Sequence, residues 1–414
     1  MAHTPTFQGN LARAVRPVEL TVPGARFAYL LHRQDAMLVN PPSAATAQRA
    51  AISVPGDGTH VFLRDLEVVA ADGTRTCGDV ILTGTEDPSL DPEGEQAQLG
   101  DALDLALDRG AEAIGLSATA AARAHGDQRF AMQSGLSDGM ALTAGAAFHA
   151  LELALSRLGR ASDDLTGAIL GANGVAGCAL AGLLGERVSR LVLIGDARYG
   201  ELSGRQAILG AAERVCAYLA SGAGTGPLAT NLQTLLQGFG NKPPQWRELA
   251  EIAIHEGWLV VTTDRRHLRL ADLLVICDGL RPVDNRHLPV AGVVCDLRRP
   301  RAISRRDAYE RADVLIVDPV SFEPPTDHGP SGLFGMRGLP PSLVQTLVMA
   351  MAGGGAGARR LEMLEPWHAS CALLGEAARL GFRASPLCSF QTRVEEHRWD
   401  GLSKLRPLPR QWHR

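Results

Sequence analysis

Three glycines, Gly171, Gly174 and Gly177, follow an apolar run at residues 166–170 and precede an apolar stretch at residues 178–184. The first run predicts a strand and the second predicts a helix. Between a strand and a helix, glycines at this spacing permit a sharp turn, a close approach to a pyrophosphate and tight packing of the helix on the strand. The start of the helix then offers free N–H groups and the positive end of its dipole to phosphate oxygens.

This context predicts a dinucleotide site whose loop residues contact the cofactor: Gly171, Asn173, Gly174, Val175 and Gly177. The alternative is a glycine-rich turn of an α/β domain that binds no ligand. Asp196 ends the next apolar run. A carboxylate there accepts hydrogen bonds from the ribose hydroxyls of NAD and repels a 2′-phosphate. Arg198 would instead favour NADP. The pattern favours NAD and leaves NADP open, and a helix-cap or turn role for Asp196 is the other interpretation.

Two cysteines, Cys277 and Cys295, end apolar runs that we expect to be strands, and each precedes an aspartate. In an open parallel sheet the reactive crevice lies beyond the carboxyl ends of the strands. A thiol near a cation has a lowered pKa and becomes nucleophilic, and Arg298 and Arg299 follow Cys295 closely. We hypothesise that one of the two cysteines is a nucleophile. The alternative is that both are buried core residues.

Carbonyl chemistry also needs a proton donor within hydrogen-bond reach of the reacting oxygen. Asp278 is the candidate acid or base, with Asp296 and His287 as further options. Asp296 has a competing role as the cap of the turn that follows it. The seven cysteines occur singly, without zinc-binding spacing, so no metal site is expected.

Strand-like and helix-like patterns alternate along the chain and predict an α/β fold. The apolar runs 166–170, 191–194, 258–262, 273–277, 290–295 and 314–318 are typical of a parallel, Rossmann-type sheet covered on both faces. An N-terminal α/β domain precedes it, with a hairpin across Asp72-Gly73 and a long helix at 143–158. A substrate would bind in the cleft between the two domains.

We expect four segments along the chain. Residues 1–160 form the N-terminal α/β domain and residues 161–325 the nucleotide-binding Rossmann domain. Residues 326–390 form helices that pack back on the first domain, and residues 391–414 form a tail that is expected to be mobile. Within the second domain, residues 221–244 are rich in Gly, Pro, Thr and Asn and suggest an inserted irregular excursion.

Composition restricts the function classes. The 414 residues include 45% hydrophobic residues, enough for two domain cores. A formal net charge of −4 argues against nucleic-acid binding. No apolar run is long enough to span a membrane and no secretory signal is visible. Single cysteines suit a reducing compartment, so a soluble, cytoplasmic protein is expected.

Eight stretches, in order, resemble the long-chain fatty acyl-[acyl carrier protein] reductases over residues 25–390. They are RFAYLLHRQD, LRDLEVVAADGTRTCGDVIL, IGLSATAAA, GMALTAG, VVCDLRRPRAIS, DVLIVDPVSFE, GLPPSL and LLGEAARLGF. The resemblance implies a two-domain, shikimate-dehydrogenase-like architecture. It also implies a family activity that reduces acyl thioesters to aldehydes with NADPH.

The sequence departs from this family at the residues that carry its chemistry. The family's nucleophilic cysteine lies on the helix after the GLPP-like segment, where this chain has Leu347. Leucine forms no thioester, and Cys371 belongs to a later helix. Met140 follows Gly139 where the family has Gly-Asn, and Asp196 replaces a basic residue. The resemblance therefore implies the fold and not the thioester mechanism.

These observations predict an NAD(P)-dependent oxidoreductase acting on a carbonyl, imine or acyl compound, either a small molecule or a carrier-bound substrate. Two alternatives stay open: a non-catalytic Rossmann partner of a biosynthetic enzyme, and an acyl-thioester reductase with a relocated cysteine. The arginine-rich run 298–306 suits an acyl carrier protein or a solvated loop face. A homo-oligomer is also open.

Overall fold

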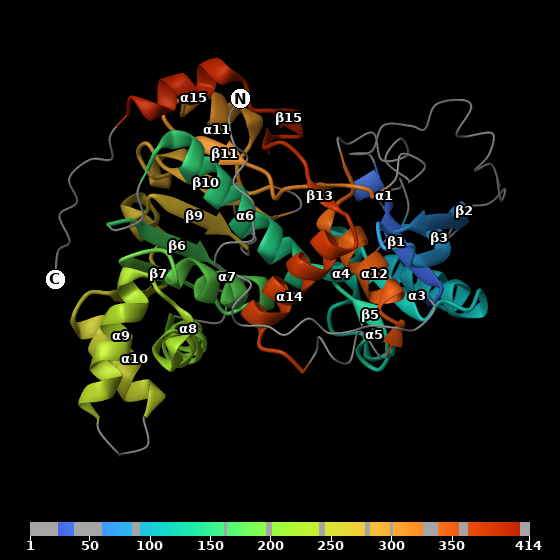
Figure 1. The fold of residues 1–414 in the computed structure, drawn as a ribbon, viewed down its shortest axis with the longest axis horizontal. Coiled ribbons are helices and arrows are strands. Elements are labelled where there is room, and N and C mark those ends of the chain that lie inside the picture. The colour runs from blue at the N-terminus through green and yellow to red at the C-terminus, as the bar shows by residue number, and fades with distance from the viewer. Residues whose placement is uncertain are drawn as a thin grey trace. The chain divides into compact units, whose positions relative to one another are not determined.

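The computed structural model describes residues 24–36, 60–84, 92–160, 164–195, 201–239, 245–277, 282–298, 301–325, 338–355 and 363–405. The chain divides into two compact units (Figure 1). Unit 1 comprises residues 1–143 and 321–385, and unit 2 comprises residues 144–320 and 386–414. Both units are α/β, and each contains its own sheet. Among the described residues, no helix has both the length and the apolar character needed to cross a membrane.

The sheet of unit 1 has the strand order β2-β3-β1-β4-β5. Strands β3, β1, β4 and β5 run parallel, and β2 pairs with β3 in the antiparallel direction. The hairpin predicted across Asp72-Gly73 is confirmed, and Gly73 supplies the positive φ of 86° at the turn. The strands are β1 (Phe27–His32), β2 (His60–Val69), β3 (Arg75–Thr83), β4 (Ala113–Leu116) and β5 (Leu136–Ser137).

Helices cover both faces of this sheet. Apolar side chains of α3 and α4 form a core with Leu30, Ile81 and Ile114 of the strands. Helix α12 lies against β4 at Gly115, where a Cβ would come within 1.7 Å of the Thr346 hydroxyl. The helices are α1 (Arg33–Ala36), α3 (Pro92–Asp108), α4 (Ala118–Ala124), α5 (Gln128–Ala131), α12 (Pro341–Met351) and α14 (Pro366–Arg379). A two-stranded ribbon of β12 (Phe322–Glu323) and β13 (Arg383–Ala384) completes the unit.

The sheet of unit 2 has six parallel strands in the order β11-β10-β9-β6-β7-β8. Numbered along the chain from β6, this is the 3-2-1-4-5-6 order of a Rossmann domain, in which the strand order reverses between the first and fourth strands. The predicted Rossmann-type sheet is therefore confirmed. The strands are β6 (Thr166–Leu170), β7 (Arg190–Ile194), β8 (Leu259–Thr262), β9 (Leu273–Ile276), β10 (Val293–Asp296) and β11 (Leu315–Val317).

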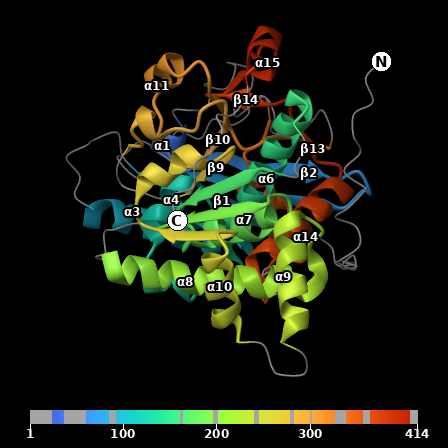
Figure 2. The same cartoon turned by 90° about the vertical axis from the view of Figure 1, so that its left-hand side faces the viewer.

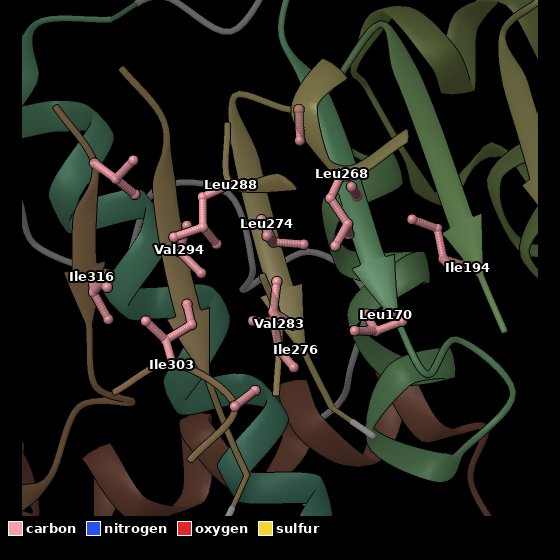
Figure 3. Close-up of a cluster of buried hydrophobic side chains, with 14 of the residues drawn as sticks. Leu170, Ile194, Leu268, Leu274, Ile276, Val283, Leu288, Val294, Ile303 and Ile316 are labelled. Carbon is pink, nitrogen blue, oxygen red and sulfur yellow. The ribbon is translucent and has the colours of Figure 1, made fainter. Parts of the chain in front are cut away.

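One face of this sheet carries an aliphatic core (Figure 3). Leu170, Ile194, Ile276 and Val294 project from the strands, and Leu268 from a connecting turn packs on them. Short pieces cover this face: η4 (Arg265–Leu270), η5 (Asn285–His287) and α11 (Arg305–Glu310). The connection from β8 to β9 is too short for a full crossover helix, so a 3₁₀ turn takes its place.

The longer helices of unit 2 are α6 (Met140–Leu158), α7 (Val175–Gly185), α8 (Glu201–Tyr218), α9 (Pro227–Gly238) and α10 (Trp246–His255). Helices α8, α9 and α10 all belong to the connection from β7 to β8 (Figure 2). The expected irregular excursion at 221–244 is instead helical over residues 221–223 and 227–238, within the part that the structure describes. Pro227 occupies the first turn of α9, and Leu228 and Leu232 bury one face of it, after a π-helical turn, η3 (Leu219–Ala223).

Two expected boundaries differ from the structure. Helix α6 runs through residue 143, so the division between the units falls inside that helix and not at residue 160. The segment expected to be a mobile tail is ordered through residue 405 as part of unit 2. It contains α15 (Glu396–Ser403), which buries Trp399 and Leu402, after a ribbon of β14 (Cys388–Ser389) and β15 (Thr392–Arg393).

Unit 1 depends on one buried carboxylate, Asp79, which is 1% exposed. Its oxygens accept hydrogen bonds from Arg109 at 2.7 and 3.0 Å, from Arg26 at 2.7 Å and from the Asp65 amide at 2.9 Å. Burial alone would raise the pKa of Asp79, but these hydrogen bonds outweigh it and hold the pKa below 3.8. The carboxylate therefore stays charged in the folded protein and joins β3 to β1 and α3.

We expect Asp79→Asn to lower the free energy of unfolding by about 1.5–3 kcal/mol near neutral pH, the range for hydrogen bonds to charged groups. Because the folded pKa is depressed, this stabilisation is complete above the unfolded pKa and is lost as pH falls through the folded value. Urea unfolding of both proteins across this range measures the difference. Asp65→Asn is the matched control, since that exposed pair with Arg26 should contribute less than about 1 kcal/mol. Equal losses in the two variants would contradict the assignment.

Candidate functional site

The glycine loop begins immediately after β6 with a turn that only glycine adopts easily. Gly171 has a φ of 89°, in the region that side chains disfavour. Its N–H donates a 2.7 Å hydrogen bond to the carbonyl of Ile194 at the end of β7. The turn is therefore fixed to the neighbouring strand before α7 starts.

Gly177 lets α7 pass directly against this turn. A Cβ at Gly177 would come within 2.1 Å of the Gly171 carbonyl oxygen and 2.9 Å of the Ala172 Cα. Real Cβ atoms do not approach backbone atoms so closely, so any side chain would push the helix away. This is the close helix–strand packing for which the third glycine of the motif is needed.

Gly174 differs because the fold itself does not require a glycine there. It caps α7 with φ −79° and ψ 165°, which any residue adopts, and a Cβ would meet only the Gly171 oxygen at 3.6 Å. Residues Asn173, Gly174 and Val175 are exposed. Neither the backbone conformation nor the neighbouring atoms therefore require a glycine at position 174.

The first turn of α7 contains backbone N–H groups that are available to donate hydrogen bonds. Within the described residues, the amides of Val175, Ala176 and Gly177 have no hydrogen-bond acceptor, as expected for the first turn of a helix. The first turn holds no acidic side chain. Eleven residues of helix aim their dipole at this end, so the loop fits a phosphate group.

The loop lies where the order of the parallel strands reverses, between β6 and β9. Cys277 follows β9 and donates its amide N–H to the Leu170 carbonyl at 2.9 Å. The structure thus brings this half-buried cysteine next to the start of the glycine loop. Three other predicted site residues, Asp278, Asp196 and Arg198, lie outside the described residues.

The position of Cys295 contradicts the hypothesis that this cysteine is a nucleophile. It lies within β10 and is 0% exposed. Burial raises the pKa of its thiol well above 9.0, and the nearby Asp318 and Asp296 add to the effect while Arg301 opposes it. A buried thiol with a raised pKa is inert. The structure therefore supports the alternative interpretation for Cys295, a core residue.

Asp296 caps the loop after β10. Its carboxylate accepts hydrogen bonds from the amides of Ala302 at 2.7 Å, Arg298 at 3.0 Å and Ile303 at 3.1 Å. With its oxygens occupied by backbone and 0% exposed, Asp296 positions the loop. No group of His, Cys, Asp and Glu side chains among the described residues is arranged to hold a metal ion.

Sequence reasoning missed a charged cluster at the carboxyl ends of β10 and β11. Arg301 forms a 2.5 Å ion pair with Asp318 and lies 4.7 Å from the centre of the Phe390 ring. Asp318 also accepts the Gln391 amide at 2.6 Å. Arg301 is thus a cation that acts on the Cys295 thiol, whereas the expected Arg299 lies outside the described residues. Residues so far apart in sequence give no local signal of this contact.

No protein-family model matches the chain, and no curated protein matches it. Solved structures similar to it include a chorismate mutase/shikimate 5-dehydrogenase fusion protein from Clostridium acetobutylicum, at 9% identity, 92% coverage of this chain, 97% of that chain and a TM-score of 0.28. Another is a shikimate 5-dehydrogenase from Mycobacterium fortuitum, at 12% identity, 85% and 99% coverage and a TM-score of 0.24. A third is L-tryptophan dehydrogenase from Nostoc punctiforme, at 10% identity, 87% and 90% coverage and a TM-score of 0.28. The fold assignment rests on the chain's own strand order.

The burial of the two thiols predicts their reactivity. We expect iodoacetamide to alkylate Cys277 in the native protein and to leave Cys295 unlabelled, because reaction needs an accessible thiolate. NADH should slow labelling of Cys277 severalfold. Labelling of Cys371, which lies in α14 of unit 1, should not change. Peptide mapping by mass spectrometry follows all three sites. Labelling of Cys295 at the same rate as Cys277 would show that the Cys295 thiol is accessible, which would contradict its assignment as a core residue.

Proposed function

We propose that unit 2 binds a nicotinamide dinucleotide and that the chain is an NAD(P)-dependent oxidoreductase. The observation that carries the proposal is the position of the glycine loop. It follows the first strand of a 3-2-1-4-5-6 sheet, at the point where the strand order reverses, which is where Rossmann domains bind their ligands. The exposed Gly174 and the unsatisfied amides of α7 support the same conclusion.

The residues of the loop would hold the pyrophosphate. The amides of Val175, Ala176 and Gly177 donate to phosphate oxygens, and the bare backbone at Gly174 lets those oxygens approach. When bound, the nicotinamide supplies or accepts a hydride. The substrate that this chemistry suits is a carbonyl, imine or acyl compound, and we place the enzyme in the cytoplasm.

We further propose that the chain is a divergent relative of the acyl carrier protein reductases. Leu347, at the family's nucleophile position, is 0% exposed within α12, so this helix offers a packed apolar residue where those enzymes need a thiol. The proposed reaction therefore transfers hydride without a thioester on α12.

A second candidate function keeps a thioester and relocates the cysteine. The observation that favours it is Cys277, half-buried and one hydrogen bond from the end of β6. In that case the Cys277 thiol takes the acyl group from an acyl thioester, and the thiol of the substrate leaves with the proton of Cys277. Reduction of the acyl group would then release an aldehyde and restore the Cys277 thiol. Cys277→Ser separates the two candidates, since it should abolish thioester reduction and spare reduction of a free carbonyl.

A substitution at Gly174 tests dinucleotide binding without damaging the fold. Aspartate is among the best N-cap residues, and the space at Gly174 accepts a side chain. We expect Gly174→Asp to retain or raise thermal stability and to weaken NADH binding at least about tenfold, or 1.4 kcal/mol, because its carboxylate repels the pyrophosphate. Fluorescence titration measures the affinity.

Two controls accompany this variant. Gly174→Asn has the same shape without the charge and should lose less affinity. Gly210→Asp adds the same charge on α8, where a Cβ meets nothing within 4 Å, and should bind NADH like the unaltered protein. If Gly174→Asp and Gly210→Asp bind NADH equally, the loop is not the cofactor site.

Cofactor preference follows from the residues after β7. We expect tighter binding of NADH than NADPH. We also expect Asp196→Ser to narrow or reverse this difference, because the carboxylate that repels the 2′-phosphate is removed. Parallel titrations with both cofactors give the ratio. A protein that prefers NADPH, and loses that preference in Arg198→Ala, would assign the ribose site to Arg198.

A further inference from the structure

A cavity of about 410 Å³ lies in unit 2, at the end of α7 opposite to the glycine loop. The residues that line it either follow the last turn of α7 or begin α9. Small-molecule sites in proteins occupy roughly 300–1,000 Å³, so this cavity is large enough for a metabolite. It lies within one unit and shares no residue with the glycine loop.

Backbone contacts fix the two sides of this cavity relative to each other. The Leu228 N–H donates to the Val188 carbonyl at 3.2 Å and joins the first turn of α9 to the chain that follows α7. A Cβ at Gly226 would lie 2.2 Å from the Glu186 carbonyl oxygen, so α9 starts this close to α7 only because residue 226 has no side chain. The cavity therefore exists before any ligand binds, which lowers the cost of binding.

Arg187 supplies a positive charge to the lining of the cavity. Its Nη2 forms a 3.2 Å ion pair with Glu152, and its side chain is 30% exposed, so the guanidinium is accessible. Among the described residues, its Nη1 has no hydrogen-bond partner. A guanidinium with donors to spare is a good partner for a carboxylate.

Glu186 supplies a negative charge to the same cavity. Its Oε1 accepts a hydrogen bond from the Tyr218 hydroxyl, and its Oε2 has no partner among the described residues. Burial raises the pKa of this carboxyl above 4.5, while Tyr218 and Arg187 oppose the shift. An ammonium group beside Oε2 would stabilise the charged carboxylate against the effect of burial.

Asn231 adds a neutral polar group to the lining. It lies in the second turn of α9, and its side-chain amide has no hydrogen-bond partner within the part of the chain that the structure describes. The neighbouring Thr230 hydroxyl already donates to the Gly226 carbonyl at 3.1 Å. A primary amide offers both donors and an acceptor, so Asn231 suits a ligand whose far end is polar and uncharged.

The two charges together indicate the kind of ligand. Both line the cavity, yet Arg187 pairs with Glu152 and not with Glu186 among the described residues. Glu186 would repel a simple anion and Arg187 a simple cation, whereas a molecule that carries both charges is attracted by both. We propose that this cavity binds a free amino acid, whose carboxylate lies at Arg187, whose ammonium lies at Glu186 and whose polar side chain lies at Asn231.

L-Glutamine is the probe, because it carries both charges and a primary amide that can pair with the Asn231 amide. Isothermal titration calorimetry of the full chain, with no NADH present, measures its affinity. Two compounds serve as controls: 4-carbamoylbutanoate lacks only the ammonium group, and 4-aminobutanamide lacks only the carboxylate. We expect both to bind at least about tenfold more weakly than L-glutamine, since each leaves one charge of the cavity without a partner.

Glu186→Gln separates recognition of charge from folding. The new amide oxygen can still accept from the Tyr218 hydroxyl, so thermal stability should be retained. We expect at least about tenfold weaker binding of L-glutamine. Binding of 4-carbamoylbutanoate should become tighter, because its carboxylate is no longer repelled. Glu256→Gln is the matched control, since Glu256 is the exposed C-cap of α10 as Glu186 is the C-cap of α7, and it should leave both affinities unchanged.

A second variant acts from α9. Asn231→Ala should weaken binding of L-glutamine by about three- to tenfold, the effect of one lost hydrogen bond, without changing the ratio of the affinities for the two control compounds. Three results would overturn the proposal. They are no saturable binding of L-glutamine up to its solubility limit, equal affinities for the three compounds, and unchanged binding of L-glutamine in both Glu186→Gln and Asn231→Ala.

Discussion

The contact between the Gly171 carbonyl and the backbone at Gly177 fixes how α7 packs on the start of the glycine loop. A Cβ at Gly177 would lie 2.1 Å from that oxygen, so α7 reaches its position only because residue 177 has no side chain. Helix α7 begins at Val175, and among the described residues the amides of Val175, Ala176 and Gly177 have no acceptor. Since Gly171 is also bonded to the end of β7, the loop is held between strands before any ligand binds. This is the preorganisation that tight binding requires.

Unit 1 divides its polar groups between the two ends of its sheet. Toward the amino end of β1, Asp79 is fully satisfied by Arg26, Arg109 and a backbone amide, and its charge stabilises the fold. At the carboxyl end, the buried Nε2 of His32 has no hydrogen-bond partner among the described residues. The first arrangement is expected of structural residues.

The sequence predicts those elements whose signals are local. The strand at 166–170 has the observed bounds, and the Asp72-Gly73 hairpin and the existence of the Rossmann strands follow from apolar runs and turn residues. Prediction from the sequence fails where tertiary contacts determine the local structure. Residues 227–238 are helical because Leu228 and Leu232 have a core to enter, although the surrounding composition suggests a loop. Cys277 and Cys295 look equivalent in sequence, yet only one lies inside a strand. The unsatisfied Nε2 of His32 lies against Gly84 at the end of another strand, and no spacing in the sequence encodes that contact.

The central claim is that the first turn of α7 binds the dinucleotide, and hydrogen–deuterium exchange tests it most directly. The amides of Val175, Ala176 and Gly177 have no acceptor within the described residues, so they should exchange rapidly in the protein alone. With saturating NADH, we expect marked slowing of exchange in peptides spanning residues 171–178 and little change in α9 or α15. Binding of NADH without slowing at residues 171–178, or protection confined to another element, would contradict it.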